Sequence, residues 1–384
     1  MADLSNVRLV FFFTRGMGLK KWDDVGMLER EVEIYRRLQS YLKSISFLTY
    51  GDQSELEYAS HLDGIEILYN RWGLPTRVYA RLAPLLHWRQ MREADVFKTN
   101  QINGSEVALF AKRLFGARLV ARCGYMWSYH AKQKAKAGVG SSTMVDLATR
   151  RERAAFWQAD RVVVTTEFMK QYALDRYSVS EDKVWVIPNY VLTDVFAPSS
   201  SHSRGNRCII FVGRLAEQKN PWALLDAMRG LDAELVMGGD GPLREPLEAK
   251  ASVEELAVKF LGNRPHRELP QHLNRATLFV LPSLYEGHPK TLLEAMSCGL
   301  PVIGTNVPGI RELIRHRETG YLCGTSPAEI RAAILKVLGD AKLREKMGRQ
   351  ARQFVVENFS VERVLTRELA LLDSLMKAEN GTES

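Results

Sequence analysis

The feature of this sequence that most constrains its fold is a regular alternation of short apolar runs with longer segments of helical periodicity. The runs are rich in valine, isoleucine and phenylalanine, as in Val7–Thr14, and continuous apolar runs of this length are typical of strands buried in parallel sheets. The next segment carries apolar residues at Leu28, Val32 and Tyr35, which is the spacing of an amphipathic helix. Repeated strand-helix units predict α/β domains.

The alternation occurs in two series, one in each half of the chain. In the first half we expect strands at 7–14, 44–49, 64–68, 97–99, 118–123, 161–165 and 184–187. The helices expected in this half are 27–42, 76–92, 106–115, 145–157 and 167–177. In the second half we expect strands at 208–212, 234–237, 258–261, 278–281 and 301–304, with helices between them and three last helices at 327–338, 341–358 and 361–376.

The length of 384 residues suits two domains. The one stretch typical of a linker is 197–206, which contains no large apolar residue. The sequence therefore predicts an N-terminal domain over 1–196 and a C-terminal domain over 207–360. The predicted fold class is α/β, with two doubly wound, Rossmann-like domains that face each other across a cleft. In such folds, ligands bind at the carboxyl ends of the strands.

Composition and the cysteines narrow the class of protein. The chain is 46% hydrophobic and 26% charged, which excludes a disordered, collagen-like or coiled-coil protein. No apolar run approaches the ~18 to 20 residues that cross a bilayer, and the N-terminus lacks the pattern of a signal peptide. The four cysteines are scattered and form no CxxC pair, which argues against a zinc site or a disulfide framework. We therefore expect a cytoplasmic protein.

Positive charge is concentrated in one stretch of the first half. The whole chain has a net charge of +8, and the segment from Val107 to Val145 contains basic residues but no acidic one. A basic surface attracts nucleic acid, anionic lipid or a phosphate-bearing substrate. No helix-turn-helix, zinc-finger or RNP-like signature is present, so we expect no nucleic-acid partner. Because Phe110, Tyr125 and Trp127 interleave with the cations, the stretch suits an anionic membrane surface. The alternative is a solvated basic face over core aromatic residues.

Two strand-to-loop junctions in the second half suit phosphate groups. In the first, Gly213 is followed by Arg214 and Lys219, ahead of an Asn-Pro pair at 220–221 that is typical of a helix start. Two cations beside a helix N-terminus favour a diphosphate, although two solvated surface cations would show the same pattern. In the second junction, Gly239 and its neighbouring glycines either allow close approach of a ligand or form a tight turn.

A third junction is more specific. After the strand 278–281, a loop at Glu286 leads into a helix that we expect to begin at Pro289. Glu294 follows within that helix, so both glutamates can reach a ligand above the helix N-terminus, where free N–H groups add an anion or hydroxyl site. Carboxylates bind vicinal hydroxyls well, as in dinucleotide-binding folds. The alternatives are a solvated loop acid for Glu286 and an ion pair for Glu294.

Together these motifs resemble the donor-site signature of the family 4 glycosyltransferases of the GT-B fold. The resemblance is carried by Gly213-Arg214 with Lys219, Gly239-Asp-Gly-Pro-Leu, Glu286-Gly287 with Glu294, Cys298-Gly-Leu-Pro-Val, Pro308-Gly-Ile-Arg-Glu and Ile187-Pro-Asn189, where Tyr190 replaces the usual glycine. It is specific from about Ala159 to Gly324 and vague before. The resemblance also implies that helix 361–376 packs back on the N-terminal domain.

The resemblance implies an enzyme that transfers a sugar from a UDP- or GDP-linked donor to an acceptor glycan or lipid-linked sugar, with retention at the anomeric carbon. No metal or other cofactor is expected, because fixed cations and helix N-termini can stabilise the departing diphosphate. The sequence contains no Asp-x-Asp metal motif. Two alternatives stay open: transfer to a soluble small molecule, and a nucleotide-sugar-binding module without catalysis.

The resemblance also implies roles for individual residues. Arg214 and Lys219 would hold the diphosphate, Glu294 the ribose, and Glu286 the donor sugar, with Arg214, Lys219 and Glu286 as the catalytic set. The full expected donor-binding set is Gly213, Arg214, Lys219, Gly239, Asn263, Arg264, Glu286, Gly287, His288, Pro289, Lys290, Thr291 and Glu294. The acceptor-side candidates in the first half are Gly16, Gly18, Arg122 and His130. For His130 the alternative is a structural role, which is the commoner one for a lone histidine.

Overall fold

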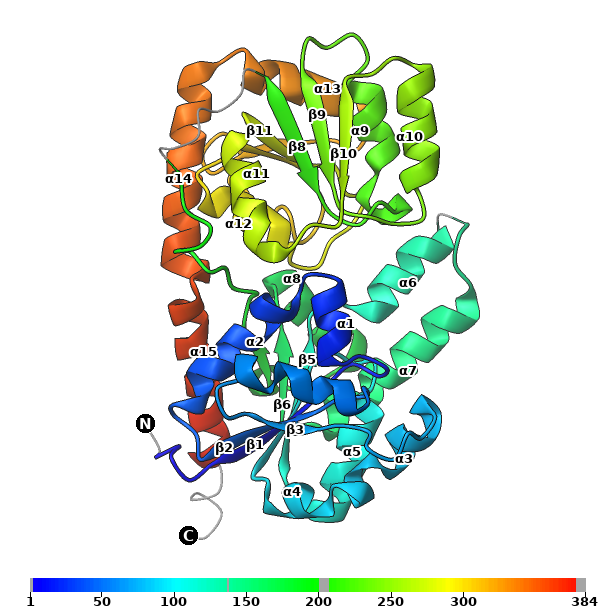
Figure 1. The fold of residues 1–384 in the computed structure, drawn as a ribbon, viewed down its shortest axis with the longest axis vertical. Helices are drawn as coiled ribbons and strands as arrows, with labels where there is room; N and C mark the ends of the chain where they lie inside the picture. Colours follow the sequence, from blue (N-terminus) through cyan, green and yellow to red (C-terminus); the bar gives the residue numbers. More distant parts are fainter. Residues whose placement is uncertain (1–2, 137, 200–206, 378–384) are drawn as a thin grey trace. The chain divides into compact units, whose positions relative to one another are not determined.

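The computed structural model describes residues 3–136, 138–199 and 207–377. It confirms the α/β fold class, with two sheets of seven and six strands that are parallel throughout (Figure 1). The chain divides into a first unit, Met1–Pro188 with Leu365–Ser384, and a second unit, Asn189–Val364. Of the stretch expected as a linker, residues 200–206 lie outside the described residues, and 197–199 belong to the second unit.

The first unit contains the seven-stranded sheet in the order β3-β2-β1-β4-β5-β6-β7. Its strands are β1 (Arg8–Phe12), β2 (Ser44–Leu48), β3 (Glu66–Leu68), β4 (Val96–Thr99), β5 (Arg118–Cys123), β6 (Arg161–Val164) and β7 (Val184–Val186). Its helices are α1 (Leu19–Asp24), α2 (Leu28–Gln39), η1 (Gln53–His61), α3 (Thr76–Leu86), α4 (Trp88–Glu93), α5 (Ser105–Phe115), α6 (Trp127–Lys136), α7 (Ser142–Gln158), α8 (Glu167–Tyr177) and η2 (Glu181–Lys183).

Both faces of the central strand β1 are buried, as its continuous apolar sequence predicts. Val10 and Phe12 belong to one hydrophobic cluster. The ring of Phe11 packs against Tyr35 of α2 at 4.3 Å and against Phe47 of β2 at 5.4 Å, centroid to centroid. Side chains on successive residues of a strand point to opposite faces, so helices must cover both sides of this sheet.

The second unit contains the six-stranded sheet in the order β10-β9-β8-β11-β12-β13. Its strands are β8 (Cys208–Val212), β9 (Glu234–Gly238), β10 (Val258–Gly262), β11 (Leu278–Leu281), β12 (Val302–Thr305) and β13 (Tyr321–Cys323). Its helices are η3 (Glu217–Lys219), α9 (Pro221–Ala227), α10 (Arg244–Val253), η4 (His266–Glu268), α11 (Leu269–Arg275), α12 (Lys290–Ser297), α13 (Pro327–Leu338) and α14 (Ala341–Phe359), followed by α15 (Val361–Lys377), most of which lies in the first unit.

In chain order, both sheets start at a central strand, run outward to one edge, and then return to the centre to run outward to the other edge. This is the strand order of doubly wound nucleotide-binding folds. The order reverses between β1 and β4 in the first sheet and between β8 and β11 in the second. Loops at the carboxyl ends of these strands form the crevice where such sheets bind ligands.

The C-terminal helix α15 is fixed to the first unit by a buried ion pair. Lys98 of β4 and Glu368 of α15 lie 2.7 Å apart, Nζ to Oε2, although 270 positions separate them in the sequence. Their side chains are only 2% and 6% exposed. Burial lowers the pKa of Lys98, and the charge of Glu368 opposes that shift. The pair therefore joins the end of the chain to the middle of the first sheet.

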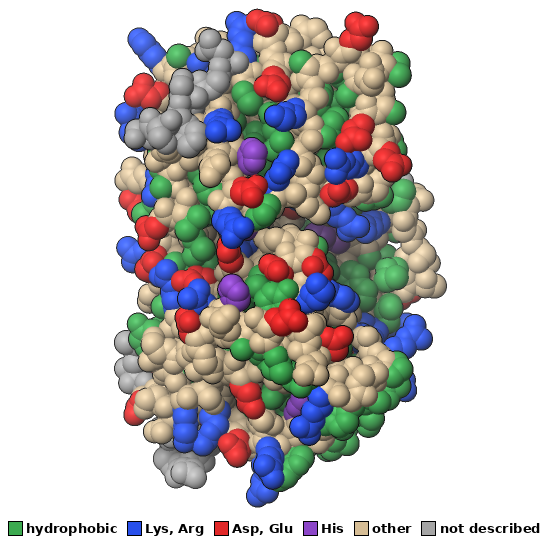
Figure 2. Space-filling model, viewed as in Figure 1, with side chains coloured by type: hydrophobic (Ala, Val, Ile, Leu, Met, Phe, Trp, Pro, Cys, Tyr) green, Lys and Arg blue, Asp and Glu red, His purple; other side chains and the backbone are tan. Residues whose placement is uncertain are grey.

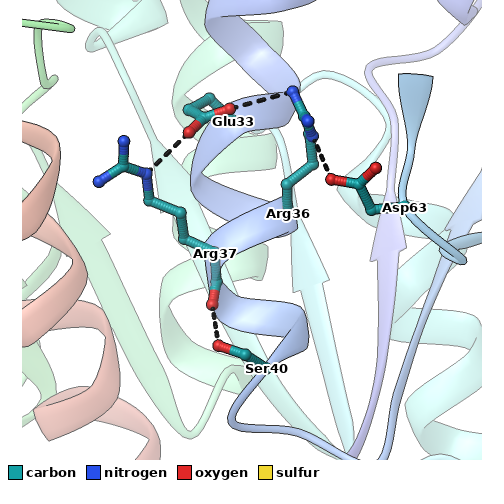
Figure 3. A network of polar contacts seen from close by, with 5 residues as sticks. All are labelled: Glu33, Arg36, Arg37, Ser40 and Asp63. Atoms are coloured by element: carbon teal, nitrogen blue, oxygen red, sulfur yellow. Dashed lines mark hydrogen bonds and ion pairs between the residues drawn. The ribbon is translucent and has the colours of Figure 1, made fainter. Parts of the chain in front are cut away.

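Helix α2, in contrast to α15, is held by ion pairs and hydrogen bonds at the surface. Figure 3 shows Glu33 accepting hydrogen bonds from Arg37 (2.7 Å) and Arg36 (3.2 Å), while Arg36 also donates to Asp63 at 2.7 Å and Ser40 to the backbone oxygen of Arg37. Asp63 has a φ of 48° in the turn before β3. Surface pairs of this kind contribute ~1 kcal/mol or less each, so they hold α2 to this turn without dominating stability.

Several elements differ from the sequence prediction, among them α1 and η1, which it did not contain. The helix expected over 76–92 is interrupted at His87, whose burial lowers its pKa to about 4 and whose Nε2 lies 2.8 Å from the hydroxyl oxygen of Tyr79. Helix α6 was not predicted, because its alternating lysines give no apolar periodicity. Strand β13 was also missed, since it is only three residues long and partly exposed.

Candidate active site

The loops that carry the expected donor-binding residues all lie at one edge of the second sheet. Strand β8 is flanked by β9 and β11, and β9 is flanked by β10. The carboxyl ends of these four parallel strands therefore bring four loops side by side, at 213–220, 239–243, 263–265 and 282–289. The edge coincides with the place where doubly wound sheets bind ligands.

Lys219 and Glu286 form an ion pair at this edge. The Nζ of Lys219 contacts the Oε1 of Glu286, and the hydroxyl of Ser283 donates to the same carboxylate oxygen at 2.6 Å. The Glu286 side chain is 7% exposed and that of Lys219 is 16% exposed. The loops after β8 and β11 thus place one cation and one carboxylate together, at the rim of the sheet.

Backbone and side-chain contacts fix the two loops against each other. The N–H of Leu284 donates to the backbone oxygen of Gln218 at 2.9 Å, and the side chain of Gln218 donates to the backbone oxygen of Tyr285 at 3.0 Å. Asn220 precedes Pro221, the first residue of α9, as predicted. Its side chain, however, does not cap the helix but donates to the backbone oxygens of Pro282 and Thr325.

Arg214 lies in the same loop and is exposed. Among the residues that the structure describes, no carboxylate lies within ion-pair distance of its guanidinium. The loop therefore offers one paired cation, Lys219, and one cation directed to solvent. This combination suits an anionic ligand that binds from outside the sheet edge.

Close packing of backbone explains the glycines of the motifs. Gly239 has a φ of +115°, and a side chain there would collide with the backbone oxygen of Gly213. Gly309, with a φ of +84°, is packed in the same way against the backbone oxygen of Gly287. For Gly239 this contact supports the tight-turn interpretation of its motif, since the crowding atoms come from the neighbouring loop.

Helix α12 begins at this site without a side-chain cap. The helix begins at Lys290, one residue later than expected, and Pro289 occupies the N-cap position. His288 is buried, and its backbone oxygen accepts a hydrogen bond of 2.8 Å from the side chain of Asn189. Since the first N–H groups of a helix carry partial positive charge, this terminus adds a second electropositive element beside Lys219.

Glu294, expected to bind ribose, is buried within α12. Its side chain is 2% exposed, and its Oε1 lies 2.9 Å from the Nε2 of His266, at the start of η4. The His266 ring packs against Phe196 at 4.8 Å. The sequence analysis missed His266, and no spacing rule distinguishes it. It follows directly after the loop of Asn263 and Arg264, both of which are exposed.

One depression of the second unit lies away from this site. A cavity of about 820 Å³ is lined by Arg207, Asp232, Glu234 and Thr277, among others. These residues lie at the amino ends of β8, β9 and β11. The cavity is therefore at the opposite edge of the sheet from the expected donor site, and its lining mixes acidic with basic groups. Its position argues against a role in the transfer reaction.

The acceptor-side candidates lie in the first unit. Gly16 and Gly18 are in the loop after β1, and a side chain at Gly18 would collide with the carboxylate of Glu55. Glu55 is 1% exposed and accepts from the N–H of Leu19 at 2.8 Å, so it caps α1 from a distance. The sequence analysis missed this buried acid, which lies 36 positions away from Leu19.

Arg122 and His130 occupy different surroundings. Arg122, in β5, donates from its Nη1 to the backbone oxygen of Asn100 at 3.1 Å. His130, in α6, packs its ring against Tyr125 at 5.2 Å. Within the described residues, no group of three histidine, cysteine, aspartate or glutamate side chains is placed to hold a metal ion. No helix in the described part of the chain has both the length and the apolar character needed to span a bilayer.

Family comparisons agree with the motifs. Residues 33–195 match the model described as Glycosyltransferase Family 4, and residues 194–354 match the model described as Glycosyl transferases group 1. The chain is 28% identical over 271 residues to an uncharacterized glycosyltransferase of Methanocaldococcus jannaschii, a match that covers 65% of this chain and 69% of that protein.

Two further curated relatives have named activities. A D-inositol 3-phosphate glycosyltransferase of Acidothermus cellulolyticus is 29% identical over 309 residues, which covers 72% of this chain and 67% of that protein. A UDP-Gal:alpha-D-GlcNAc-diphosphoundecaprenol alpha-1,3-galactosyltransferase of Escherichia coli is 29% identical over 210 residues. That match covers 50% of this chain and only 54% of the relative.

Solved structures share the whole fold. Anabaena HepE in complex with UDP and glucose aligns with a TM-score of 0.77 at 19% identity, covering 96% of this chain and 100% of that one. Sucrose-phosphate synthase from Thermosynechococcus elongatus aligns with a TM-score of 0.78 at 19% identity, covering 97% and 100%. The two matched models together span residues 33–354, and the chain belongs to the family 4 glycosyltransferases, enzymes of the GT-B fold.

Proposed function

We propose that this glycosyltransferase takes a UDP- or GDP-linked sugar as donor and transfers it with retention of anomeric configuration to an acceptor glycan or lipid-linked sugar. The observation that carries the proposal is the Lys219–Glu286 ion pair beside the N-terminus of α12, at the carboxyl edge of the second sheet. The binding of UDP and glucose by Anabaena HepE supports the donor class. The lipid-linked acceptor in the name of the E. coli relative supports the acceptor class.

The chemistry follows from charge placement. As the bond between sugar and diphosphate breaks, negative charge develops on the leaving diphosphate. Lys219, Arg214 and the uncapped start of α12 would stabilise that charge. Glu286 would bind hydroxyls of the donor sugar through its carboxylate, and the leaving diphosphate would accept the proton of the acceptor hydroxyl on the same face. In this scheme neither a metal ion nor a covalent nucleophile is needed.

A product analysis tests the proposal. The purified chain would be incubated with a panel of UDP- and GDP-sugars and with glycan, lipid-linked and soluble acceptors, and the products read by mass spectrometry. NMR of the product gives the configuration at the new linkage. We expect transfer from one of these donors with the donor's own anomeric configuration. An inverted product would contradict retention, and a product formed only with a soluble small molecule would contradict the acceptor class.

The two glutamates should affect donor binding differently. We expect Glu294→Gln to weaken UDP itself, because a ribose hydroxyl loses its anionic acceptor, and Glu286→Gln to spare UDP while weakening the UDP-sugar. Calorimetry with UDP and with the UDP-sugar identified by the product analysis measures both effects. Glu217→Gln, an exposed acid in η3 close to Lys219 in sequence, is the matched control. Equal weakening of UDP and UDP-sugar by Glu286→Gln would contradict its assignment to the sugar.

We further propose that the basic surface of the first unit attaches the enzyme to anionic lipids on the inner face of the cytoplasmic membrane. Lys132, Lys134 and Lys136 are all exposed on α6. Of the apolar residues in this stretch, Phe110 and Tyr125 are 37% and 38% exposed, whereas Met126 is buried. Each exposed cation near an anionic surface contributes about 1 kcal/mol, so several together give reversible, salt-sensitive binding.

Vesicle flotation tests the attachment. Wild-type protein should float with anionic vesicles at low salt but not with neutral ones, and the triple variant with Lys132, Lys134 and Lys136 changed to Glu should not float. The control carries the same charge change in the second unit, with the exposed residues Lys342, Lys346 and Arg349 of α14 changed to Glu. Equal flotation of the α6 variant and wild type, or no flotation of either, would contradict the proposal.

A further inference from the structure

The first unit contains a cavity lined mainly by arginines that the donor site does not involve. Its volume is about 620 Å³, and its lining is Arg15, Arg77, Ala80, Arg81, Glu106, Phe110 and Arg151. Cavities of ~300 to 1,000 Å³ are the size of small-molecule sites. None of these residues belongs to the acceptor-side candidates that the sequence singled out.

The cavity lies where a doubly wound sheet binds ligands. Arg15 is in the loop after β1, and Glu106 is in the first turn of α5, which follows β4. β1 and β4 are the neighbouring strands between which the strand order reverses. Arg77 and Arg81 reach the cavity from α3 and Arg151 from α7. The arginines therefore converge on the switch point of the first sheet.

The loop that carries Arg15 is held by the neighbouring loop. The backbone N–H of Arg15 donates to the backbone oxygen of Asn103 at 3.3 Å. Gly104 adopts a φ of +103°, and a side chain there would lie 2.8 Å from the backbone nitrogen of Arg15. The Arg151 guanidinium lies 5.6 Å from the ring centroid of Trp127, close to the Oδ1 of Asn103. Two of the arginines are thus positioned by specific contacts before a ligand arrives.

The charges in the cavity do not balance. Four arginines face one carboxylate, that of Glu106, which pairs with Arg15. Among the described residues, no carboxylate lies within ion-pair distance of Arg77 or Arg81. These two are four positions apart on α3, where like charges destabilise a helix by ~0.2 to 0.5 kcal/mol. Burial, and then the charge of Arg151, lower the pKa of Arg15, as expected for a cation without enough counter-charge.

We infer that this cavity binds a phosphate ester carried by the acceptor. Arginine binds phosphate through two parallel N–H donors, and Arg77 and Arg81 are exposed on one face of α3 with these donors available. The inference rests on the proposed function only where it identifies the molecule that carries the phosphate as the acceptor of the transfer. The cavity itself is a site for a phosphate group in the first unit, separate from the diphosphate of the donor in the second.

The wall of the cavity also has an apolar side. Phe110 lines it. Outside the lining, Val78, Leu82 and Leu85 are 41%, 39% and 50% exposed on α3, the helix that carries Arg77 and Arg81. Figure 2 shows hydrophobic side chains gathered at the lower right, over the region of α3 in Figure 1. A phosphate beside an apolar surface suits either a lipid phosphate or a soluble sugar phosphate. The experiment therefore includes both sources.

The test compares the double variant Arg77→Gln/Arg81→Gln with Arg89→Gln/Arg92→Gln. The second pair is exposed on α4, in the same unit, and outside the cavity lining, so both variants lose two charges. Calorimetry at fixed ionic strength, with UDP present to occupy the donor site, measures binding of glucose 6-phosphate and of farnesyl diphosphate, with glucose and farnesol as uncharged counterparts.

We expect the α3 variant to bind the phosphates roughly tenfold or more weakly than wild type, since charge-assisted hydrogen bonds are lost. The α4 control should stay within about twofold of wild type. Stronger binding of farnesyl diphosphate than of glucose 6-phosphate would identify the lipid source, and the reverse order the soluble one. Equal binding by both variants, or no phosphate binding by wild type, would overturn the inference.

The outcome is separable from that of the proposed function. UDP binding without added phosphate reports on the second unit, and both variants should retain it. If neither UDP nor GDP bound while the phosphate difference between the variants persisted, the donor proposal would fail and the phosphate site would stand. If UDP bound normally and the variants did not differ, the reverse would hold.

Discussion

Replacing Lys219 by alanine should lower turnover by roughly 100-fold or more, the loss typical of removing one group that stabilises developing charge. The contact of an ammonium with the leaving diphosphate strengthens as the sugar departs, so its loss is felt in the transition state more than in the ground state. Single-turnover rates at saturating donor, read by mass spectrometry of the product, measure the effect.

The ion pair complicates this variant, because Lys219→Ala leaves the buried Glu286 without its cation. Arg214→Ala serves as the matched variant. Arg214 is exposed, so removing it takes away a cation without unpairing a buried acid. We expect a comparable loss of turnover with unchanged thermal unfolding for Arg214→Ala, and a further loss of stability only for Lys219→Ala. Near-normal turnover in both variants would contradict the assignment of the diphosphate to this loop.

The sequence predicted the elements of the fold well wherever local pattern and burial agree. Strand 118–123 and helix 167–177 were predicted with the bounds that the structure shows. The first is a largely buried run, and the second has an N-cap at Thr166 whose side chain accepts from the N–H of Met169. Helix α6 was not predicted, because its sequence has no apolar stripe and therefore does not show the periodicity of an amphipathic helix.

Residue types at the candidate site were also predictable, but their pairings were not. Lys219 and Glu286 could be named from their motifs, whereas their contact joins positions 67 apart. The contact of Glu294 in α12 with His266 in η4 joins elements that follow β11 and β10, two strands that β8 and β9 separate in the sheet. Local sequence spacing therefore predicts which side chains one element carries, whereas the strand order of the sheet determines which of these side chains come into contact.

The arginine cavity shows the same limit. The sequence analysis singled out the stretch from Val107 to Val145 because it contains basic residues and no acidic one. None of the four cavity arginines lies in that stretch. They come from three separate elements, the loop after β1, α3 and α7, and converge only in the folded unit.

Replacing Glu368 by glutamine should destabilise the first unit by about 3 to 5 kcal/mol, the usual cost of leaving one member of a buried ion pair without its partner. Lys98 is 2% exposed and lies 5.4 Å from the ring centroid of Tyr35, which cannot replace a carboxylate. Urea unfolding measures the change. The exposed pair of Lys20 and Asp24, 3.5 Å apart, supplies the control, and Asp24→Asn should cost less than about 1 kcal/mol.

The pH dependence of Glu368→Gln separates loss of the ion pair from loss of packing. The pKa of Lys98 is already lowered by burial, and Glu368 is the group that opposes this shift. Without Glu368 the pKa of Lys98 should fall further, so the unfolded chain, with an ordinary lysine, binds more protons than the folded one. Stability then rises with pH through the window between the lowered pKa and about 10.4, the ordinary pKa of lysine. The deficit of the variant relative to wild type should therefore shrink as the pH rises through the window between the pKa of Lys98 in the variant and its higher pKa in the wild type. A deficit that is constant with pH would mean that packing, not an unpaired charge, holds α15 to the first sheet.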